Sequence, residues 1–233
     1  SACAALAGAS RSNGAGSAGG RPATPGAPPA PAPVRALAPA PTPAPFAAEP
    51  TAAAPAVPTV DPAVVAARND KYASQGAPPM TIDPQKSYTA TITTPRGDIV
   101  IKLRPDIAPK TVNSFVFLAK EGYYNGVTWH RVLSSFMAQG GDPTGTGMGG
   151  SKLPDLPQEF SAEPHVRGVC SMARAQNPNS ANSQFFICFD DARFLDRQYT
   201  VWGEVIEGMD NVDALPKGEP PREPGKIVKA TVA

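Results

Sequence analysis

The sequence has few of the residues from which metal centres are built. Among its 233 residues there are three cysteines and two histidines, and no CxxC pair occurs. Zinc sites use closely spaced cysteine and histidine ligands, whereas His130 and His165 stand in separate parts of the chain. We therefore expect no metal site, and we expect both histidines to have structural or surface positions.

The sequence also lacks an excess of charge and a long apolar run. Its 21 Lys and Arg residues are nearly balanced by 20 Asp and Glu residues, which leaves a net charge of +1. No basic block occurs, so the electrostatic footprint of a nucleic-acid-binding protein is missing. Spanning a membrane as a helix takes about 18 or more consecutive apolar residues, and the sequence contains no such run.

Proline, in contrast, is abundant and unevenly placed. About half of the 29 prolines lie within residues 22–62, in a tract of Ala, Pro, Thr and Gly with almost no aromatic residues. Frequent prolines oppose helix formation, and the tract has too little apolar surface to offset the entropy of ordering. We expect a disordered linker over residues 1–62, a marginal helix and connector over 63–81, and a folded domain over 82–233. The marginal helix is predicted from Asp61, as its N-cap, to Gln75.

The three cysteines predict different environments. Cys3 follows Ser1 and Ala2, which resembles the end of a bacterial lipobox, where the cysteine carries a lipid anchor. One interpretation is a protein exported to the cell envelope, periplasmic or otherwise extracytoplasmic, and anchored to the membrane there. The other is a chance cysteine in an Ala-rich segment of a cytoplasmic protein. Cys170 and Cys188 lie in predicted strands, where they are most simply small core residues, and a disulfide between them is left open.

Period-two alternation predicts a domain dominated by short strands. Tyr88, Ala90 and Ile92 alternate with threonines over residues 87–94, and a Pro-Arg-Gly-Asp turn leads into a returning strand over 99–103. Six further strands are expected at residues 128–132, 136–139, 167–173, 184–189, 200–206 and 227–232.

Two helices complete the predicted domain. One begins near Pro109 and ends at Gly122, and its apolar residues fall on one stripe. That stripe consists of Val112, Phe115, Val116 and Ala119. The other helix covers residues 209–215. The expected fold class is mainly β: an eight-stranded closed antiparallel barrel capped by two α-helices. Because closure leaves no free sheet edge, we expect a monomer.

Residues 129–150 hold the most unusual local pattern. A single cation, Arg131, stands in a largely apolar strand, followed by Phe136, Met137 and the amide of Gln139. A buried charge without a partner is costly, so Arg131 needs either a partner or a task; the alternative is a surface arginine lying over apolar neighbours. The glycine-rich end, GTGMGG, superficially resembles a phosphate loop, but no helix is predicted after it. We interpret that loop as turn structure.

Five segments occur in the order WHRV, SFMAQGGDPTGTGMGG, SMARA, NSQFFI and FLDRQYTVWGEV. Together they resemble the cyclophilin family of peptidyl-prolyl cis/trans isomerases, and the resemblance covers residues 87–232. It implies an eight-stranded antiparallel barrel with two helices, which agrees with the strand count. It also implies proline-containing polypeptides as partners and no cofactor.

The resemblance assigns roles residue by residue. It places the catalytic arginine on Arg131, with Gln139 beside it. It places the apolar pocket for proline on Phe136, Met137, Phe186 and Leu195. Gln184 lines the groove, and the backbone at Ala173 and Arg174 meets the substrate peptide. Phe194 and Tyr199 stand where eukaryotic members of the family commonly have Trp and His. Many bacterial members carry Phe and Tyr at these positions, as this chain does.

The implied function is isomerisation of X-Pro bonds in proteins, in support of protein folding. An alternative is a proline-peptide binding module or chaperone in which turnover is incidental. A third hypothesis is a surface-anchored spacer protein, for which the proline-rich tract would matter more than the groove.

Overall fold

The structure is a computed structural model that describes residues 63, 64, 67 and 69–233. The predicted linker over 1–62 and the predicted lipidation site Cys3 lie outside the described residues. Of the helix predicted over 61–75, residues 63, 64 and 67 are helical, and Asn69–Tyr72 forms the short 3-10 helix η1.

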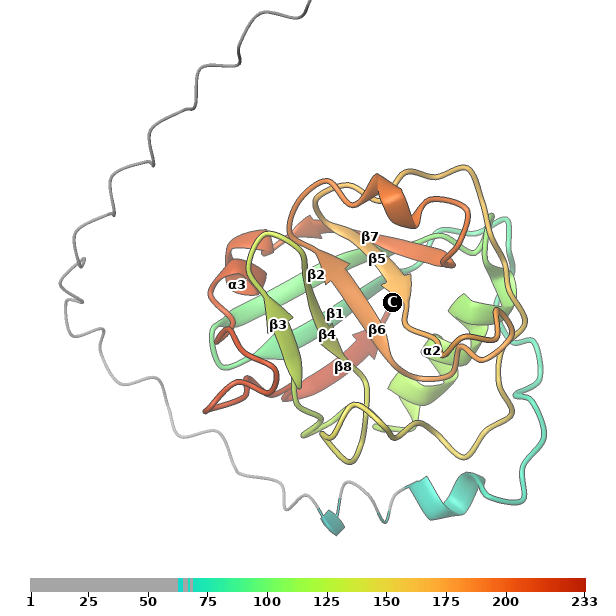
Figure 1. The fold of residues 1–233 in the computed structure, drawn as a ribbon. Helices are drawn as coiled ribbons and strands as arrows, with labels where there is room; N and C mark the ends of the chain where they lie inside the picture. Colours follow the sequence, from blue (N-terminus) through green and yellow to red (C-terminus); the bar gives the residue numbers. More distant parts are fainter. Residues whose placement is uncertain (1–62, 65–66, 68) are drawn as a thin grey trace, which may run out of the picture. The chain divides into compact units, whose positions relative to one another are not determined.

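All eight predicted strands are present, with their ends shifted by a few residues. They are β1 (Thr89–Thr94), β2 (Gly97–Leu103), β3 (Arg131–Leu133), β4 (Met137–Gly140), β5 (Val169–Met172), β6 (Phe185–Cys188), β7 (Val201–Glu207) and β8 (Lys229–Val232). They form one antiparallel sheet in the order β3-β4-β6-β5-β7-β2-β1-β8 (Figure 1). The period-two alternation that predicted β1 matches the burial of its residues: Ala90 and Ile92 are fully buried, and the threonine between them is partly exposed.

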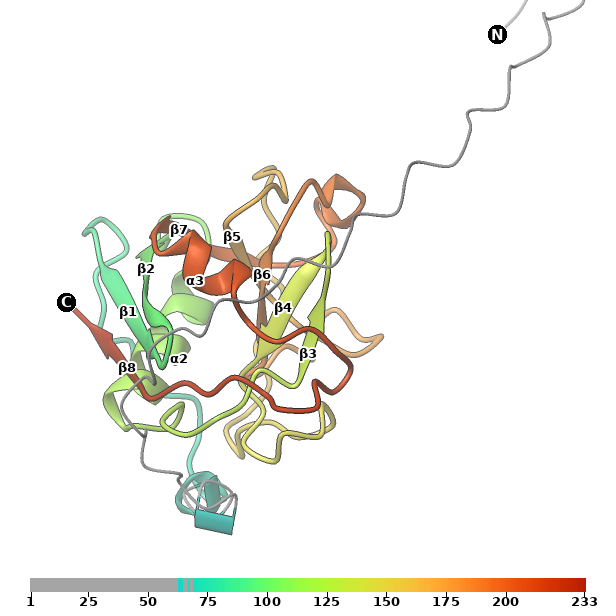
Figure 2. The same cartoon turned by 90° about the vertical axis from the view of Figure 1, so that its left-hand side faces the viewer.

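The sheet curls into a half-barrel. Its two edge strands, β3 and β8, stand at opposite ends of the strand order and are not hydrogen-bonded to each other as neighbouring strands. The chain between α3 and β8 runs along the side between them (Figure 2). There Gly218 exchanges two backbone hydrogen bonds with Val132, and the Trp129 amide donates to the Gly225 carbonyl. Pro220, Pro221 and Pro224 lack amide hydrogens, so this segment cannot form a continuous ladder. Closure of the barrel by strand pairing stays a prediction.

Both predicted helices form. Helix α2 (Pro109–Lys120) packs beside β8 and buries the whole predicted stripe, and Gly122 follows it with the positive φ of 69° that favours glycine at a helix end. Its first turn has no cap from Ala108; instead the Glu159 carboxylate accepts bonds from the amides of Lys110 and Thr111. Helix α3 (Met209–Asp213) is shorter than predicted and lies near β2. Within the described residues, no helix is long and apolar enough to cross a membrane.

Strand alternation separates the two cysteines. Cys170 pairs with Ile187 across β5 and β6, so Cys188, the next residue along β6, faces the opposite side of the sheet. Cys170 belongs to the main core, Cys188 lies among Met137, Phe186 and Leu195, and both are free thiols. The disulfide that the sequence left open is therefore not formed. Burial raises the pKa of Cys188 to about 12 and that of Cys170 well above its usual value, which makes both thiols unreactive.

The connector before residue 82 packs against the domain. Tyr72 is fully buried, and its ring centroid lies 6.1 Å from that of Phe117 and 6.0 Å from that of Tyr123. The Asn69 side chain donates to the Gly150 carbonyl at 2.6 Å and accepts from the Lys152 amide at 2.8 Å. The boundary at residue 82 stays a prediction, but the packing of the fold reaches back to Asn69.

This packing can be tested by Tyr72→Ala. Emptying a fully buried aromatic position costs about 3–5 kcal/mol of unfolding free energy, which urea denaturation measures. The matched control is Asp70→Ala, because the Asp70 side chain is 69% exposed and pairs with Lys152 on the surface; it is expected to cost less than about 1 kcal/mol. Equal, small effects of both substitutions would show that the connector is not part of the core.

Candidate active site

An apolar floor forms on the face of β4 and β6 that is turned away from the main core. Along β4, Ala138 points into the main core, whereas Met137 joins Phe186 of β6 in a second apolar cluster. Leu195, from the 3-10 helix η2 (Arg193–Leu195), completes the cluster, and Phe136 packs against it. The sequence alone could not say which side chains of these strands face the core and which face the groove. The alternation of side chains along β4 and β6 in the structure assigns each of them to one side.

A pocket with a volume of about 230 Å³ opens over this floor. Ligand pockets for drug-sized molecules start at about 300 Å³, so this one suits a single ring or side chain. Every residue that lines it was a predicted site residue. The lining residues are Arg131, Phe136, Met137, Gln139, Ala173, Arg174, Phe186, Leu195 and Tyr199.

The two remaining predicted site residues lie at the margins of this pocket. Gln184 lines an adjoining hollow of about 480 Å³, which shares Gln139, Ala173 and Arg174 with the pocket. Phe194 is 66% exposed, and its ring centroid lies 5.6 Å from that of Phe136 at the rim. The predicted residues thus meet in one continuous groove, although they come from four separate segments of the chain.

Arg131 has a partner that the sequence did not indicate. Gln139 pairs with Arg131 in the β3–β4 register, but its amide nitrogen donates to Oε1 of Gln184 at 2.9 Å. The Arg131 Nε instead donates to Oε1 of Glu219 at 2.5 Å, across 88 residues of sequence. The only clue in the sequence was general: a cation over apolar surface needs a partner.

The glycine-rich loop is built around the buried carboxylate of Asp142. This carboxylate accepts backbone bonds from Thr144, Thr146, Gly147 and Gly149 at 2.6–3.1 Å. Burial by itself would raise the pKa of Asp142, but bonds from Thr144, Gly149 and Gly147 outweigh it and the pKa is lowered. Because these amides are already used, they are not available to a phosphate, which agrees with the turn structure predicted for the loop.

Neither histidine lines the apolar pocket. His165 is fully buried beneath Phe186, with Nδ1 3.0 Å from the Asp196 carboxylate and Nε2 3.0 Å from the Ser171 hydroxyl. His130 is also buried, and burial is the main cause of its lowered pKa. Both have the structural positions that the sequence suggested, and His165 supports the pocket floor from below.

The Arg174 side chain joins two walls of the groove. Its Nε and Nη2 donate to the Gln198 carbonyl at 3.1 and 3.0 Å, and its Nη1 donates to the carbonyls of Ala175 and Gln176. The guanidinium also lies 4.5 Å from the centroid of the Tyr199 ring, which meets Phe186 edge to face. The sequence predicted only a backbone role for Arg174, so this clamp is an addition from the structure.

Arg174→Lys tests the clamp. Lysine keeps the charge but has no planar fork with which to bridge both loops, so Tyr199 should lose its fixed position. We expect KM for an X-Pro peptide to rise about threefold to tenfold with a smaller change in kcat, in a protease-coupled isomerisation assay. Arg193→Ala, which alters an exposed arginine of the Tyr199-bearing loop, should leave KM unchanged. An unaltered KM for Arg174→Lys would argue against the clamp.

Comparison with known proteins agrees with this geometry. Residues 89–232 match the family model described as cyclophilin type peptidyl-prolyl cis-trans isomerase. A probable peptidyl-prolyl cis-trans isomerase of Brucella suis is 53% identical in an alignment 152 residues long that covers 58% of this chain and 78% of the relative. The isomerase ppi1 of Schizosaccharomyces pombe is 42% identical in an alignment 145 residues long that covers 58% of this chain and 92% of the relative.

Solved structures of cyclophilins are also similar to this chain. A cyclophilin from Hirschia baltica superposes with a TM-score of 0.58 at 32% identity, over 64% of this chain and 74% of the other. A Cryptosporidium parvum cyclophilin, solved in the presence of the dipeptide Ala-Pro, gives a TM-score of 0.59 at 31% identity, over 62% of this chain and 98% of the other. With the family model matched across more than half of its length, the chain belongs to the cyclophilin-type peptidyl-prolyl cis/trans isomerases.

Proposed function

We propose that this chain accelerates the cis/trans rotation of X-Pro bonds with the proline ring seated in the pocket above Phe186 and Met137. One observation carries the proposal: the pocket is small, its floor is apolar, and the guanidinium of Arg131 stands at its edge without being tied to the Gln198 loop as that of Arg174 is. Proline-containing polypeptides are the substrates, as the Ala-Pro dipeptide used with the Cryptosporidium parvum neighbour suggests.

The uncatalysed reaction is slow because amide resonance gives the C–N bond partial double-bond character. The barrier to rotation is roughly 20 kcal/mol. In the twisted transition state the resonance is lost, and the prolyl nitrogen regains a lone pair that can accept a hydrogen bond. No bond to carbon is made or broken, so the reaction needs no nucleophile and no titrating base.

Arg131 supplies the hydrogen bond that only the twisted state can use. A guanidinium directed at the prolyl nitrogen stabilises the transition state over both planar isomers, which is differential binding of the kind that raises kcat. An acceleration of about 10⁵ requires roughly 7 kcal/mol. One charge-assisted bond in an apolar site, together with a fixed proline ring, is a source of that size.

The other groove residues hold the substrate. Phe136, Met137 and Phe186 exclude water from the ring, and a dry site favours the twisted amide because it is less polar than the planar one. Gln139 and Gln184 bond to each other, and Gln184 also donates to the Gly147 and Gly149 carbonyls. This amide chain fixes the wall beside Arg131, so the backbone of the bound peptide meets a preorganised surface.

The cellular setting belongs to the proposal as well. We place the protein among folding assistants of exported proteins, with Cys3 as a lipid attachment site and the proline-rich tract as a tether. Mass spectrometry of the N-terminal peptide from the native host tests this placement. An unmodified Cys3 would remove the anchor and favour the cytoplasmic alternative.

Arg131→Ala tests the mechanism. Removing the donor that acts only in the transition state should lower kcat/KM about 10²- to 10³-fold, measured with a short X-Pro peptide. Arg96→Ala, in the exposed β1–β2 turn, is the matched loss of one arginine and should keep full activity. Equal activity of Arg131→Ala and the unaltered protein would refute the mechanism, and peptide affinity without turnover in the unaltered protein would favour a binding module.

A further inference from the structure

The groove contains one charged contact that the isomerase mechanism has not used, namely the ion pair between Arg131 and Glu219. We propose that Glu219 is a positioning residue that sets the orientation of the Arg131 guanidinium. The inference rests on the function proposed above, because it concerns the same cation. Glu219 itself lies outside the proline pocket, since it lines a separate hollow with His130, Met148 and Pro220, which Arg131 also lines.

The backbone fixes both partners of the pair to the same point. Val132 follows Arg131, and it exchanges two hydrogen bonds of 2.8 and 2.9 Å with Gly218, the residue before Glu219. The two charged residues therefore flank a single β-bridge. Gly218 has a φ of 149°, and a Cβ there would lie 2.6 Å from Pro221 Cα, so the turn that presents Glu219 requires glycine.

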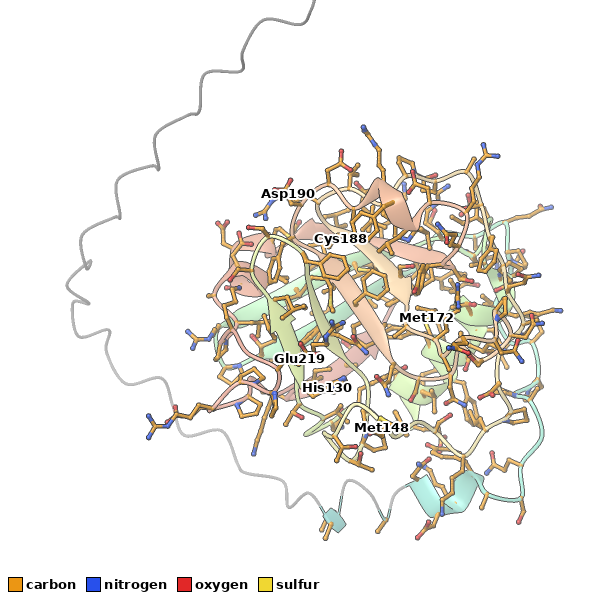
Figure 3. The ribbon with its side chains drawn as sticks, in the orientation of Figure 1. His130, Met148, Met172, Cys188, Asp190 and Glu219 are labelled. Carbon is orange, nitrogen blue, oxygen red and sulfur yellow. The ribbon has the colours of Figure 1, made fainter. Side chains whose placement is uncertain are left out.

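Figure 3 shows where Glu219 lies relative to His130 and Met148. Glu219 lies over the β3 ribbon, with His130 and then Met148 below it. These three residues line the same hollow, which also includes Arg131 and Gln139. The carboxylate thus reaches the guanidinium from a hollow other than the one above the apolar floor, and Arg131 lines both.

The choice of atom matters for catalysis. Glu219 accepts from Nε at 2.5 Å, which leaves the two terminal NH₂ groups of the fork for the substrate. A guanidinium is planar, so fixing Nε also fixes the plane in which the terminal groups lie. A carboxylate partner further reduces the cost of covering the cation when a peptide binds.

Gln139 does not take this place in the structure: its side chain bonds to Gln184, whereas the Arg131 Nε donates to Glu219. The side chains of Arg131 and Glu219 are 34% and 58% exposed, so solvent weakens the pair in the free protein. A bound peptide would exclude water from the pair and strengthen it. Glu219 should therefore contribute to turnover more than to folding stability.

The test compares Glu219→Gln and Glu219→Ala with the unaltered protein. We expect kcat to fall about threefold to tenfold with KM changed less than about twofold, and Glu219→Gln, which keeps an oxygen acceptor, should lose less than Glu219→Ala. The melting temperature should stay the same. In an Arg131→Ala background, Glu219→Ala should cause no further loss, because the two residues act as a unit. The ¹⁵Nε resonance of Arg131 should shift in both single variants.

The matched control is Asp213→Ala, which removes the carboxylate of another exposed ion pair, with Arg167, neither residue of which lines the groove. It should leave kcat unchanged. If the unaltered protein is inactive, or Arg131→Ala is fully active, the proposed function itself fails. If Arg131→Ala is impaired but both Glu219 variants keep or exceed the original kcat, or the Arg131 ¹⁵Nε resonance does not move, only the role of Glu219 is overturned.

Discussion

The structure depends on one constraint: a cation must be held in a fixed orientation at the edge of a dry surface. A flexible arginine would place its donors at many angles, and a solvated one would bind water in preference to a twisted amide. The β3–β4 pairing fixes the backbone of Arg131, the apolar cluster below it excludes water, and Glu219 fixes the guanidinium plane. Each of these requirements comes from a different part of the chain, so the site exists only after the whole sheet has formed.

Strand alternation lets the same short segments build both the core and the groove. Phe185 and Ile187 of β6 face a core rich in aromatic rings, in which Phe185 meets Trp129 and Trp202 edge to face. The intervening Phe186 faces the groove and stacks above the buried His165. The groove floor is thus the outer surface of a close-packed sheet, and close packing resists displacement. If the proline ring binds as proposed, this rigid floor is what would hold it still.

Local pattern in the sequence was sufficient for the elements but not for the site. Alternation and turn residues predicted all eight strands, and the stripe on α2 predicted its buried face, because these depend on neighbours along the chain. Arg131, Phe136, Met137 and Gln139 could be recognised as unusual because they lie within nine residues of one another in the sequence. Ala173, Phe186, Leu195 and Tyr199 joined them only through family resemblance, since no local rule connects distant loops.

Glu219 was missed for the same reason: it lies in a proline-rich connection without periodicity. Gln139 was expected to hold Arg131, and the register does place it opposite, but its side chain bonds to Gln184, a contact that could not be foreseen from either segment.

The proline-rich connection between α3 and β8 accounts for two features together: the isolated bridges at the seam and the contact between Glu219 and Arg131. Pro220, Pro221 and Pro224 cannot donate to a ladder, so the segment crosses the seam between β3 and β8 with isolated bridges where a paired strand would have run. A residue in a regular strand points perpendicular to the sheet and alternates strictly with its neighbours. Glu219 stands outside any strand, directly after the Gly218 bridge, and is therefore free to turn its carboxylate along the sheet edge toward Nε of Arg131. The irregularity that interrupts the sheet at the seam is what allows an acidic side chain to reach the cation from outside the pocket.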